Sequence, residues 1–319
     1  MDIRPYHRQR DEPLVYGLWQ RALGNQWPLP LKTFRHKVNG HPQHEVADHF
    51  VACEGEEVIG FVATQTPMGL GGEERAGLMC LLVTPDRQRQ GVGRALHDHA
   101  LDALCRRGVT EAQLGAGGLS YFWAGVPTNL PGALAFFRAC GWPDTGPAFD
   151  LVMDLTGYAT PASIYERIRR PDVTLSVAGP EDVSAVLEFE AQHFPRWVPH
   201  YQKVVDHGAI SDLVLARERT SGRVLGVSSV LDSRREWQRF GFCIWQQMLG
   251  ESVGGVGPLG VAEDAQGQGI GLALAARVTE LLHARGLATS FVGYTWLADW
   301  YGRLGYRVWQ EYRTSWRAL

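Results

Sequence analysis

Apolar and polar positions along this chain follow first a strand-like and then a helix-like pattern, and this succession occurs twice. An apolar run at 78–83 predicts a buried strand. After a glycine turn, Leu96, Ala100 and Leu104 recur every fourth residue on one helix face. Arg107-Gly108 then supplies a typical helix end. The pattern therefore predicts a strand, a glycine turn and a helix.

The second copy lies 178 residues further on, where Gln266 matches Gln88 and Leu274 matches Leu96. The segments around both copies also agree, because 49–62 and 213–227 each read as a strand hairpin. A single repeat of this length indicates duplicated domains and not a solenoid. We expect a first domain at 1–156, a connector at 157–172 and a second domain at 173–319.

Composition narrows the possible functions. The chain has 319 residues, a net charge of −3 and a pI near 6.4, which argues against nucleic acid as a partner. Five cysteines without a CxxC pair indicate reduced thiols in a cytoplasmic protein, and no spacing suggests a metal site. No window approaches 18 apolar residues and the N-terminus lacks a signal-peptide pattern, so we expect no membrane segment.

The glycine turn has the chemistry of an anion site. A helix N-terminus presents unpaired N–H groups, and glycines allow a ligand to approach the backbone closely. The spacing Gln88-x-x-Gly91-x-Gly93 therefore suits a pyrophosphate at the helix start. A plain strand-to-helix turn is the alternative for one such loop, but two matched copies make it much less attractive. A Rossmann site lacks its third glycine, since Leu96 stands there, and no Gly-Lys-Ser/Thr of a P-loop follows.

These residues resemble the GCN5-related N-acetyltransferase (GNAT) superfamily, in an arrangement similar to mycothiol synthase-like two-domain members. The Q/R-x-x-G-x-G/A loop is matched at Gln88 and Gln266, and a later aromatic-glycine element at 136–142 and 300–306. The resemblance implies an α/β fold (α+β in some schemes) of two tandem GNAT domains. Each would be a mixed, mostly antiparallel sheet with splayed parallel central strands, flanked by helices.

The resemblance also implies acetyl-CoA as co-substrate. Backbone amides of the glycine loops would hold its pyrophosphate, and the ends of the preceding strands would pair with its pantetheine arm. In the first half these positions are Leu81, Leu82, Val83, Gln88, Arg89, Gln90, Gly91, Val92, Gly93 and Arg94. In the second half they are Leu259, Gly260, Val261, Gln266, Gly267, Gln268, Gly269, Ile270, Gly271 and Leu272.

The two halves differ where the family places its general acid. Tyr301 stands there in the second half and Phe137 in the first, so we expect a catalytic second half and a first half that is degenerate in catalysis. Glu251 is a weaker candidate base. The first half is 14 residues longer between the loop and this element, and the extra length falls at 115–127. We expect that insertion to form a lid or a wall of the acceptor site.

The leading functional hypothesis is an acetyl-CoA-dependent N-acetyltransferase that acts on a primary amine of a small molecule, as a monomer or homodimer. Amino-sugar, antibiotic, amino-acid and peptide amines stay open as acceptors. One alternative is a CoA-binding sensor or scaffold without turnover. Another is an aminoacyl transferase on a GNAT-like fold.

Overall fold

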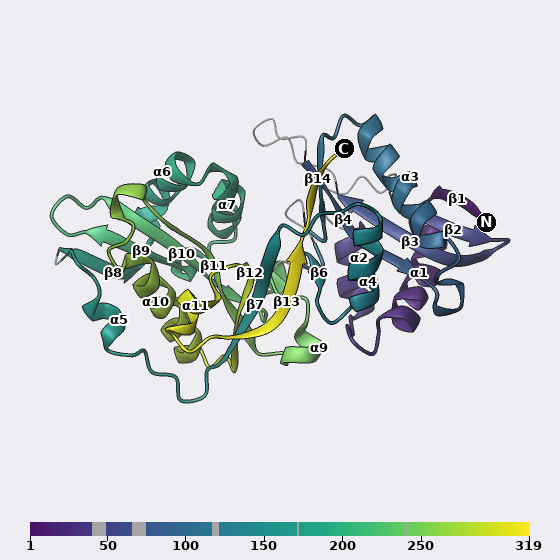
Figure 1. The fold of residues 1–319 in the computed structure, drawn as a ribbon. Coiled ribbons are helices and arrows are strands. Elements are labelled where there is room, and N and C mark those ends of the chain that lie inside the picture. Colours follow the sequence, from purple (N-terminus) through teal and green to yellow (C-terminus); the bar gives the residue numbers. More distant parts are fainter. Residues whose placement is uncertain (40–48, 66–74, 117–120, 171, 240–241) are drawn as a thin grey trace. The chain divides into compact units, whose positions relative to one another are not determined.

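The structure is a computed structural model that describes residues 1–39, 49–65, 75–116, 121–170, 172–239 and 242–319. The chain divides into two compact units (Figure 1). The first comprises Met1–Asp150, Ile244–Met248 and Gln310–Leu319, and the second Leu151–Cys243 and Leu249–Trp309. Each unit is a mixed α/β structure. The domain boundaries at 156 and 173 stay a prediction. The compact units do not follow the two copies of the repeat, because the first unit also includes two segments from the second half of the sequence.

The sheet of the first unit has the strand order β1-β2-β3-β4-β5-β14. Neighbours are antiparallel except β4 and β5, which are parallel. The last strand comes from the far end of the chain and pairs Trp316 with Gln113 of β5. The strands are β1 (Asp2–Pro5), β2 (Phe50–Glu54), β3 (Glu57–Gln65), β4 (Arg75–Val83), β5 (Glu111–Leu114) and β14 (Trp316–Ala318), with a short β6 (Val126–Pro127) apart from them.

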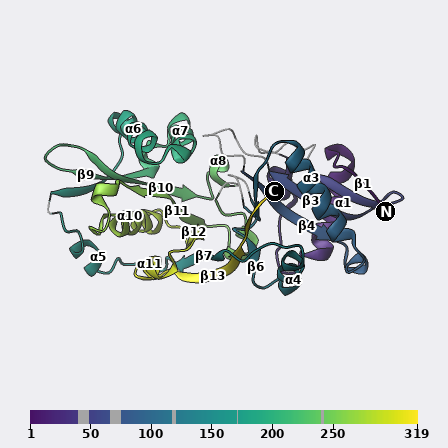
Figure 2. The ribbon, with the colours of Figure 1, turned by 45° about the horizontal axis from the view of Figure 1, so that its top comes forward.

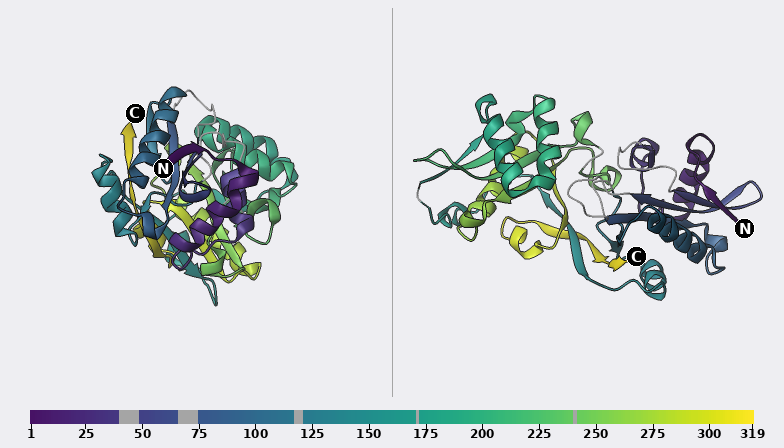
Figure 3. Two further views of the ribbon diagram at one scale, coloured as in Figure 1. Left: turned by 90° about the vertical axis from the view of Figure 1, so that its right-hand side faces the viewer. Right: turned by 90° about the horizontal axis from the view of Figure 1, so that it is seen from above.

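Helices cover both faces of this sheet, with α1 and α3 on opposite sides (Figure 3, right). The predicted helix face on α3 is buried, since Leu96, Ala100 and Leu104 are fully covered. The helices are α1 (Arg8–Ala22), α2 (Leu31–Asn39), α3 (Val92–Arg106) and α4 (Pro131–Ala139).

β7 begins in the first unit and enters the second at Leu151, where the strands follow the order β7-β12-β11-β10-β9-β8 and β11 and β12 form a parallel pair. The strands are β7 (Gly146–Asp154), β8 (Val173–Val177), β9 (Leu213–Glu218), β10 (Val224–Asp232), β11 (Val253–Val261) and β12 (Thr289–Thr295). β13 (Arg307–Thr314) begins in this unit and ends in the first, where Tyr312 pairs with Pro127 of β6. Both sheets are thus mixed and mostly antiparallel, as expected.

The second sheet also lies between helices. Figure 2 shows α6 and α7 on one face and α10 on the other. Leu274, Val278 and Leu282 of α10 are fully buried, which matches the face predicted from the repeat. The helices are α5 (Ser163–Glu166), α6 (Val183–His193), α7 (Val198–Asp206), α8 (Glu236–Arg239), α9 (Gln246–Leu249), α10 (Ile270–Ala284) and α11 (Ala298–Gly302). Among the described residues, no helix combines the length and the apolar character that a membrane span requires.

A cluster of aromatic side chains fills part of the core of the first unit. Trp123 stacks on Trp19 at a centroid distance of 5.5 Å and on Trp245 at 5.9 Å. Trp27, Phe34 and Phe122 complete the cluster, and all six rings are buried. Phe122 and Trp123 belong to the insertion expected to form a lid or wall, of which 117–120 lie outside the described residues. The described end of the insertion instead packs into the core.

Candidate functional site

The two central parallel strands of the first unit diverge at a defined residue. β4 pairs with β5 from Arg75–Glu111 to Leu78–Leu114, and the Gly115 N–H then donates to the Leu78 carbonyl (2.7 Å). Past this point β4 continues to Val83 without β5 beside it. A ladder that ends while one strand continues leaves a strand edge to which an extended ligand can add.

A β-bulge marks the same place. Ala63 of β3 pairs with Cys80, but Thr64 pairs with Leu78, so Met79 is extra on β4. A bulge redirects the backbone groups of its strand and is typical of functional sites in sheets. The bulge thus lies where the splay opens.

The second unit repeats both features. β11 pairs with β12 only from Val253–Thr289 to Gly255–Phe291. Immediately after, Gly257 and Pro258 form a bulge, because Ser228 pairs with Leu259 and Val230 with Val256. Gly257 is 178 residues after Met79. The repeat seen in the sequence is therefore a repeat of backbone geometry, with the expected splayed strands in both halves.

The glycine loops have one architecture. Gln88 Nε2 donates to the Val83 carbonyl (3.2 Å), and Gln266 Nε2 donates to the Val261 carbonyl (3.0 Å). Gly91 and Gly269 precede their helices with φ of 89° and 85°, a region that favours glycine. The glutamine side chains thus tie each loop to the end of the preceding strand, and anion binding by the first backbone amides of α3 and α10 stays a prediction.

Side chains of the strand ends alternate in burial on β4 but not on β11, where both Gly260 and Val261 are buried. Leu81 and Val83 are partly exposed on β4, whereas Leu82 is buried. On β11 Leu259 is partly exposed, whereas Gly260 is buried and a Cβ there would collide with the Phe194 ring. The strand-end residues thus lie beside the splay in both halves.

Tyr301 lies on α11 and is 8% exposed. Its ring packs against Trp300 at 4.7 Å and Tyr306 at 5.6 Å between centroids. Burial raises the pKa of the Tyr301 hydroxyl to about 12, so the group is protonated at neutral pH and able to donate a proton. Its role as general acid stays a prediction.

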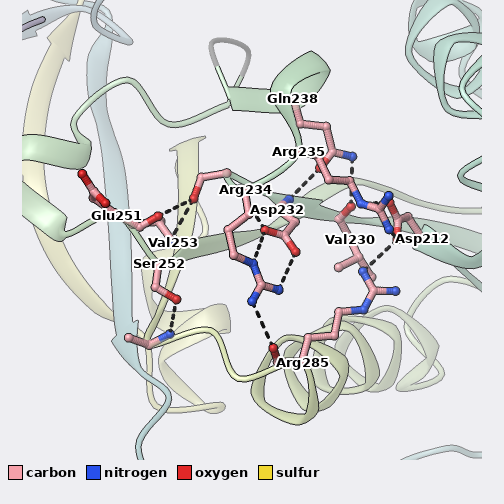
Figure 4. Close-up of polar contacts among 12 residues, drawn as sticks. Asp212, Val230, Asp232, Arg234, Arg235, Gln238, Glu251, Ser252, Val253 and Arg285 are labelled. Atoms are coloured by element: carbon pink, nitrogen blue, oxygen red, sulfur yellow. Dashed lines mark hydrogen bonds and ion pairs between the residues drawn. The ribbon is translucent and has the colours of Figure 1, made fainter.

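Glu251 lies before the start of β11, on the paired side of the splay. It is exposed, and its main-chain carbonyl accepts a hydrogen bond from Ser233 Oγ (2.9 Å). Its carboxylate points away from the Asp232–Arg234 ion pair (Figure 4). It stands five positions before Val256, the first residue of β11 past its pairing with β12, which is about 16 Å of extended chain. Its role as a base stays a prediction, and this distance weakens it.

Phe137 of the first half lies on α4 among other rings. It contacts Phe136 at 5.1 Å and Trp142 at 6.4 Å, and Trp142 Nε1 donates to His97 Nε2 (2.8 Å). Phe137 therefore has a packing role and no proton to donate.

Sequence reasoning missed two buried polar side chains in the first half. Gln65, at the end of β3, is fully buried, and neither its amide oxygen nor its amide nitrogen has a hydrogen-bond partner among the described residues. Lys37 of α2 is 4% exposed, and burial lowers its pKa to about 8. Its ammonium lies 5.8 Å from the Tyr121 ring centroid. A glutamine that ends an apolar strand is the one signal that could have pointed to Gln65.

The second half contains a buried acid that was also missed. Glu190 of α6 is fully buried, and burial raises its pKa to about 8, although the nearby Tyr201 hydroxyl lowers it in part. Tyr201 itself donates to the carbonyl of Pro258 in the bulge (2.7 Å). His200 contacts Ser229 Oγ (2.9 Å) opposite that bulge, and burial lowers its pKa to about 4. Among the described residues, no group of three or more candidate metal ligands is found.

Two sheets with bulged, splayed central strands, each followed by a glycine turn and a helix, define a tandem GNAT fold. The family model described as "Acetyltransferase (GNAT) family" matches residues 14–142. A [ribosomal protein bS18]-alanine N-acetyltransferase of Escherichia coli K12 is 30% identical over 132 residues, 41% of this chain and 74% of that protein. The chain belongs to the GNAT acetyltransferase family.

Two longer matches extend over both halves. A mycothiol acetyltransferase of Cellulomonas flavigena is 28% identical over 257 residues, 77% of this chain and 66% of that protein. A solved structure is described as a GCN5-related glucosamine N-acetyltransferase region of a fungal multi-domain GH3 β-N-acetylglucosaminidase. It is 30% identical with a TM-score of 0.89 and covers 99% of this chain. The chain spans only 38% of the length of that fungal chain.

Proposed function

We propose that this protein is an acetyl-CoA-dependent N-acetyltransferase whose acceptor is the primary amine of a small molecule, with an amino sugar as the first candidate. The splay carries the proposal: a strand edge opens at a bulge and leads directly to a glycine turn at a helix N-terminus. Family membership supports the reaction class. The fungal region, described as a glucosamine N-acetyltransferase, supports an amino sugar as the acceptor.

The residues present suit the co-substrate. Amides at the start of the helix would bind the pyrophosphate, and the strand edge Leu81–Val83 would pair with the pantetheine arm. When bound, acetyl-CoA supplies the thioester. The acceptor nitrogen then forms a bond to the acetyl carbon while the carbon–sulfur bond breaks. The amine loses one proton and the leaving thiolate gains one, so the site needs a route for a single proton.

The test is release of free CoA thiol when the full chain is given acetyl-CoA and a panel of amines, with the acetylated product identified by mass spectrometry. We expect release with glucosamine and none with N-acetylglucosamine, which has no free amine. Samples without acceptor correct for the exposed thiol of Cys105. If no amine in the panel releases thiol although CoA binds, the protein is a CoA-binding module and the proposal fails.

A further inference from the structure

The two glycine loops differ in charge although their backbones agree. Arg87, Arg89 and Arg94 lie along the first loop. The Arg87 guanidinium is paired with Glu54 and Asp86, and one Arg94 nitrogen donates to the Ala139 carbonyl. The residues 178 positions later are Ala265, Gly267 and Leu272, so the second loop itself carries none of these cations, although Arg167 and Arg169 of the connector lie next to it. Arg89 and Arg94 are exposed. Guanidinium groups form strong, charge-assisted bonds to phosphate, and CoA carries three phosphates.

Arg89 also keeps a backbone conformation that favours glycine. Its φ is 62°, and Gly267 at the matching position has φ of 72°. A non-glycine residue in this region is strained by about 1 kcal/mol or more, and such strain is concentrated at functional sites. The first loop therefore holds an exposed cation in a position that the second loop gives to glycine.

The second loop is covered by the chain's own connector. A Cβ at Gly269 would collide with the carbonyl of Arg167 and lie 3.0 Å from the Ile168 nitrogen. The Arg169 N–H donates to the Gln268 carbonyl (3.1 Å). A Cβ at Gly91 of the first loop would meet no described atom within 4 Å. Connector backbone thus lies against the second turn, while the first turn is open at this position.

The connector is fixed on α10 by several contacts. The Tyr165 hydroxyl and Thr160 Oγ1 both donate to Glu280 Oε1 at 2.7 Å, and Ile164 is 2% exposed. Figure 1 shows α5, which carries Tyr165, beside α10. The cover over the second loop is therefore part of the packed structure of that unit.

A third difference lies where the strands diverge. Gln65 pairs with Gly77 across β3 and β4, and a Cβ at Gly77 would lie 2.9 Å from Gln65 Nε2. Leu231 pairs with Gly255 at the matching place in the second half. There a Cβ would lie 3.1 Å from the Phe242 ring. The first half has a buried amide without a partner among the described residues, which points to a ligand. The second half has apolar side chains.

We propose that the chain binds one CoA, in the first half, and that the connector has taken the place of a ligand at the second glycine loop. The inference rests on the proposed function for its ligand and deepens it by assigning the half that works. Arg89 and Arg94 bind the phosphates of CoA, and the Gln65 amide hydrogen-bonds a substrate at the reacting end. This assignment is the opposite of the one expected from Tyr301.

Calorimetric titration of the full chain with CoA tests the inference without turnover. The wild-type chain is expected to bind one CoA. Arg89→Gly with Arg94→Leu gives the first loop the residues of the second, and weakens binding by roughly tenfold or more because two charge-assisted contacts are lost. Gly93→Asp and Gly271→Asp form a matched pair, since each Cβ would lie 3.4 Å from one aromatic ring. Gly93→Asp abolishes binding, whereas Gly271→Asp leaves it within about twofold.

The outcomes separate the inference from the proposed function. Two equal CoA sites, or loss of binding in Gly271→Asp but not in Gly93→Asp, would overturn the inference and leave the proposed function standing. Loss of turnover in Tyr301→Phe would also overturn it, because the reaction would then lie in the second half. No CoA binding by the wild-type chain would overturn the proposed function itself. Far-UV circular dichroism of each variant establishes that it is folded.

Discussion

The two halves of this chain have the same backbone geometry at the bulge and the glycine turn, but they differ in the side chains and chain segments around these features. Bulges at Met79 and Gly257, and glycines with φ near 90° at 91 and 269, occupy matching positions. In the first half, arginines lie along the glycine loop, and the buried amide of Gln65 lies where the central strands diverge. At the second loop Gly267 and Leu272 stand in place of two of these arginines, and the connector lies against the turn. The glycine motif therefore shows where a ligand fits, and the side chains around it show whether the half is equipped to hold one.

Two matching glycines of the repeated backbone serve helix packing in both halves. A Cβ at Gly60 would lie 2.7 Å from Leu96, and a Cβ at Gly226 would lie 2.9 Å from Leu274. These glycines let α3 and α10 approach their sheets closely. These glycines are needed for packing whether or not a half binds a cofactor. Packing alone can therefore maintain this part of the repeated backbone.

The halves also differ in their cores, and this gives the largest expected effect. Trp123→Ala removes a ring that stacks on both Trp19 and Trp245 in the first unit. We expect a loss of about 3–5 kcal/mol in the free energy of unfolding of that unit. Urea unfolding followed by far-UV circular dichroism measures it, with the transition of the second unit unchanged.

Trp296→Ala is the matched control, because Trp296 is 71% exposed. Its effect should stay within about 0.5 kcal/mol. An equal shift of both transitions in Trp123→Ala would mean that the cluster supports the whole chain and does not distinguish the halves.

Local sequence patterns predicted the strand, glycine turn and helix of each half, whereas the contacts between segments distant in the sequence could not be predicted. The strand, turn and helix around Gln88 follow from residue spacing alone, and so does the splay once the family resemblance is drawn. The pairing of Trp316 with Gln113 could not be predicted, because it joins the end of the chain to the first sheet. Likewise, nothing in the spacing around Gln268 indicates that Arg169 binds it. The position of Gln65 opposite Gly77 depends on the register of β3 against β4, which a sequence pattern does not fix.

Gln65→Leu is the second way to test the comparison, since it gives the first half the residue found at the matching place in the second. If the amide bonds a substrate, kcat/KM falls by roughly tenfold or more, because one buried hydrogen bond is lost. Steady-state thiol release measures the loss, and Gln65→Glu should not restore the rate. An unchanged kcat/KM with a higher melting temperature would show that Gln65 is only an unsatisfied core residue.

The smallest expected effect concerns the buried acids of the first helix in each half. In α1, burial raises the pKa of Asp11, but hydrogen bonds from Arg4 and Arg10 lower it to about 2. In α6, burial raises the pKa of Glu190 to about 8, and the nearby Tyr201 hydroxyl lowers it only in part. The first acid therefore stays ionised in the folded protein, whereas the second stays protonated near neutral pH.

This difference predicts a pH dependence of stability with a definite sign. Between its unfolded pKa near ~4.3 and its folded value, Glu190 keeps a proton in the folded state that the unfolded chain releases. Stability then falls as pH rises, by at most about 1.4 kcal/mol per pH unit for this group. His200, with a folded pKa of about 4, has the opposite effect but only up to its unfolded pKa near ~6.5. The window from about pH 6.5 to 7.5 therefore isolates Glu190.

Glu190→Gln removes the titrating group and keeps its shape, so the variant should lose less stability than the wild type across that window. Urea unfolding at several pH values measures the two slopes. Glu188→Gln on the same helix is the control, because Glu188 is exposed and its replacement should leave the wild-type slope. If Glu190→Gln and the wild type have equal slopes, the carboxyl is ionised when folded. The second half would then hold a buried charge as the first half does, and this part of the contrast would disappear.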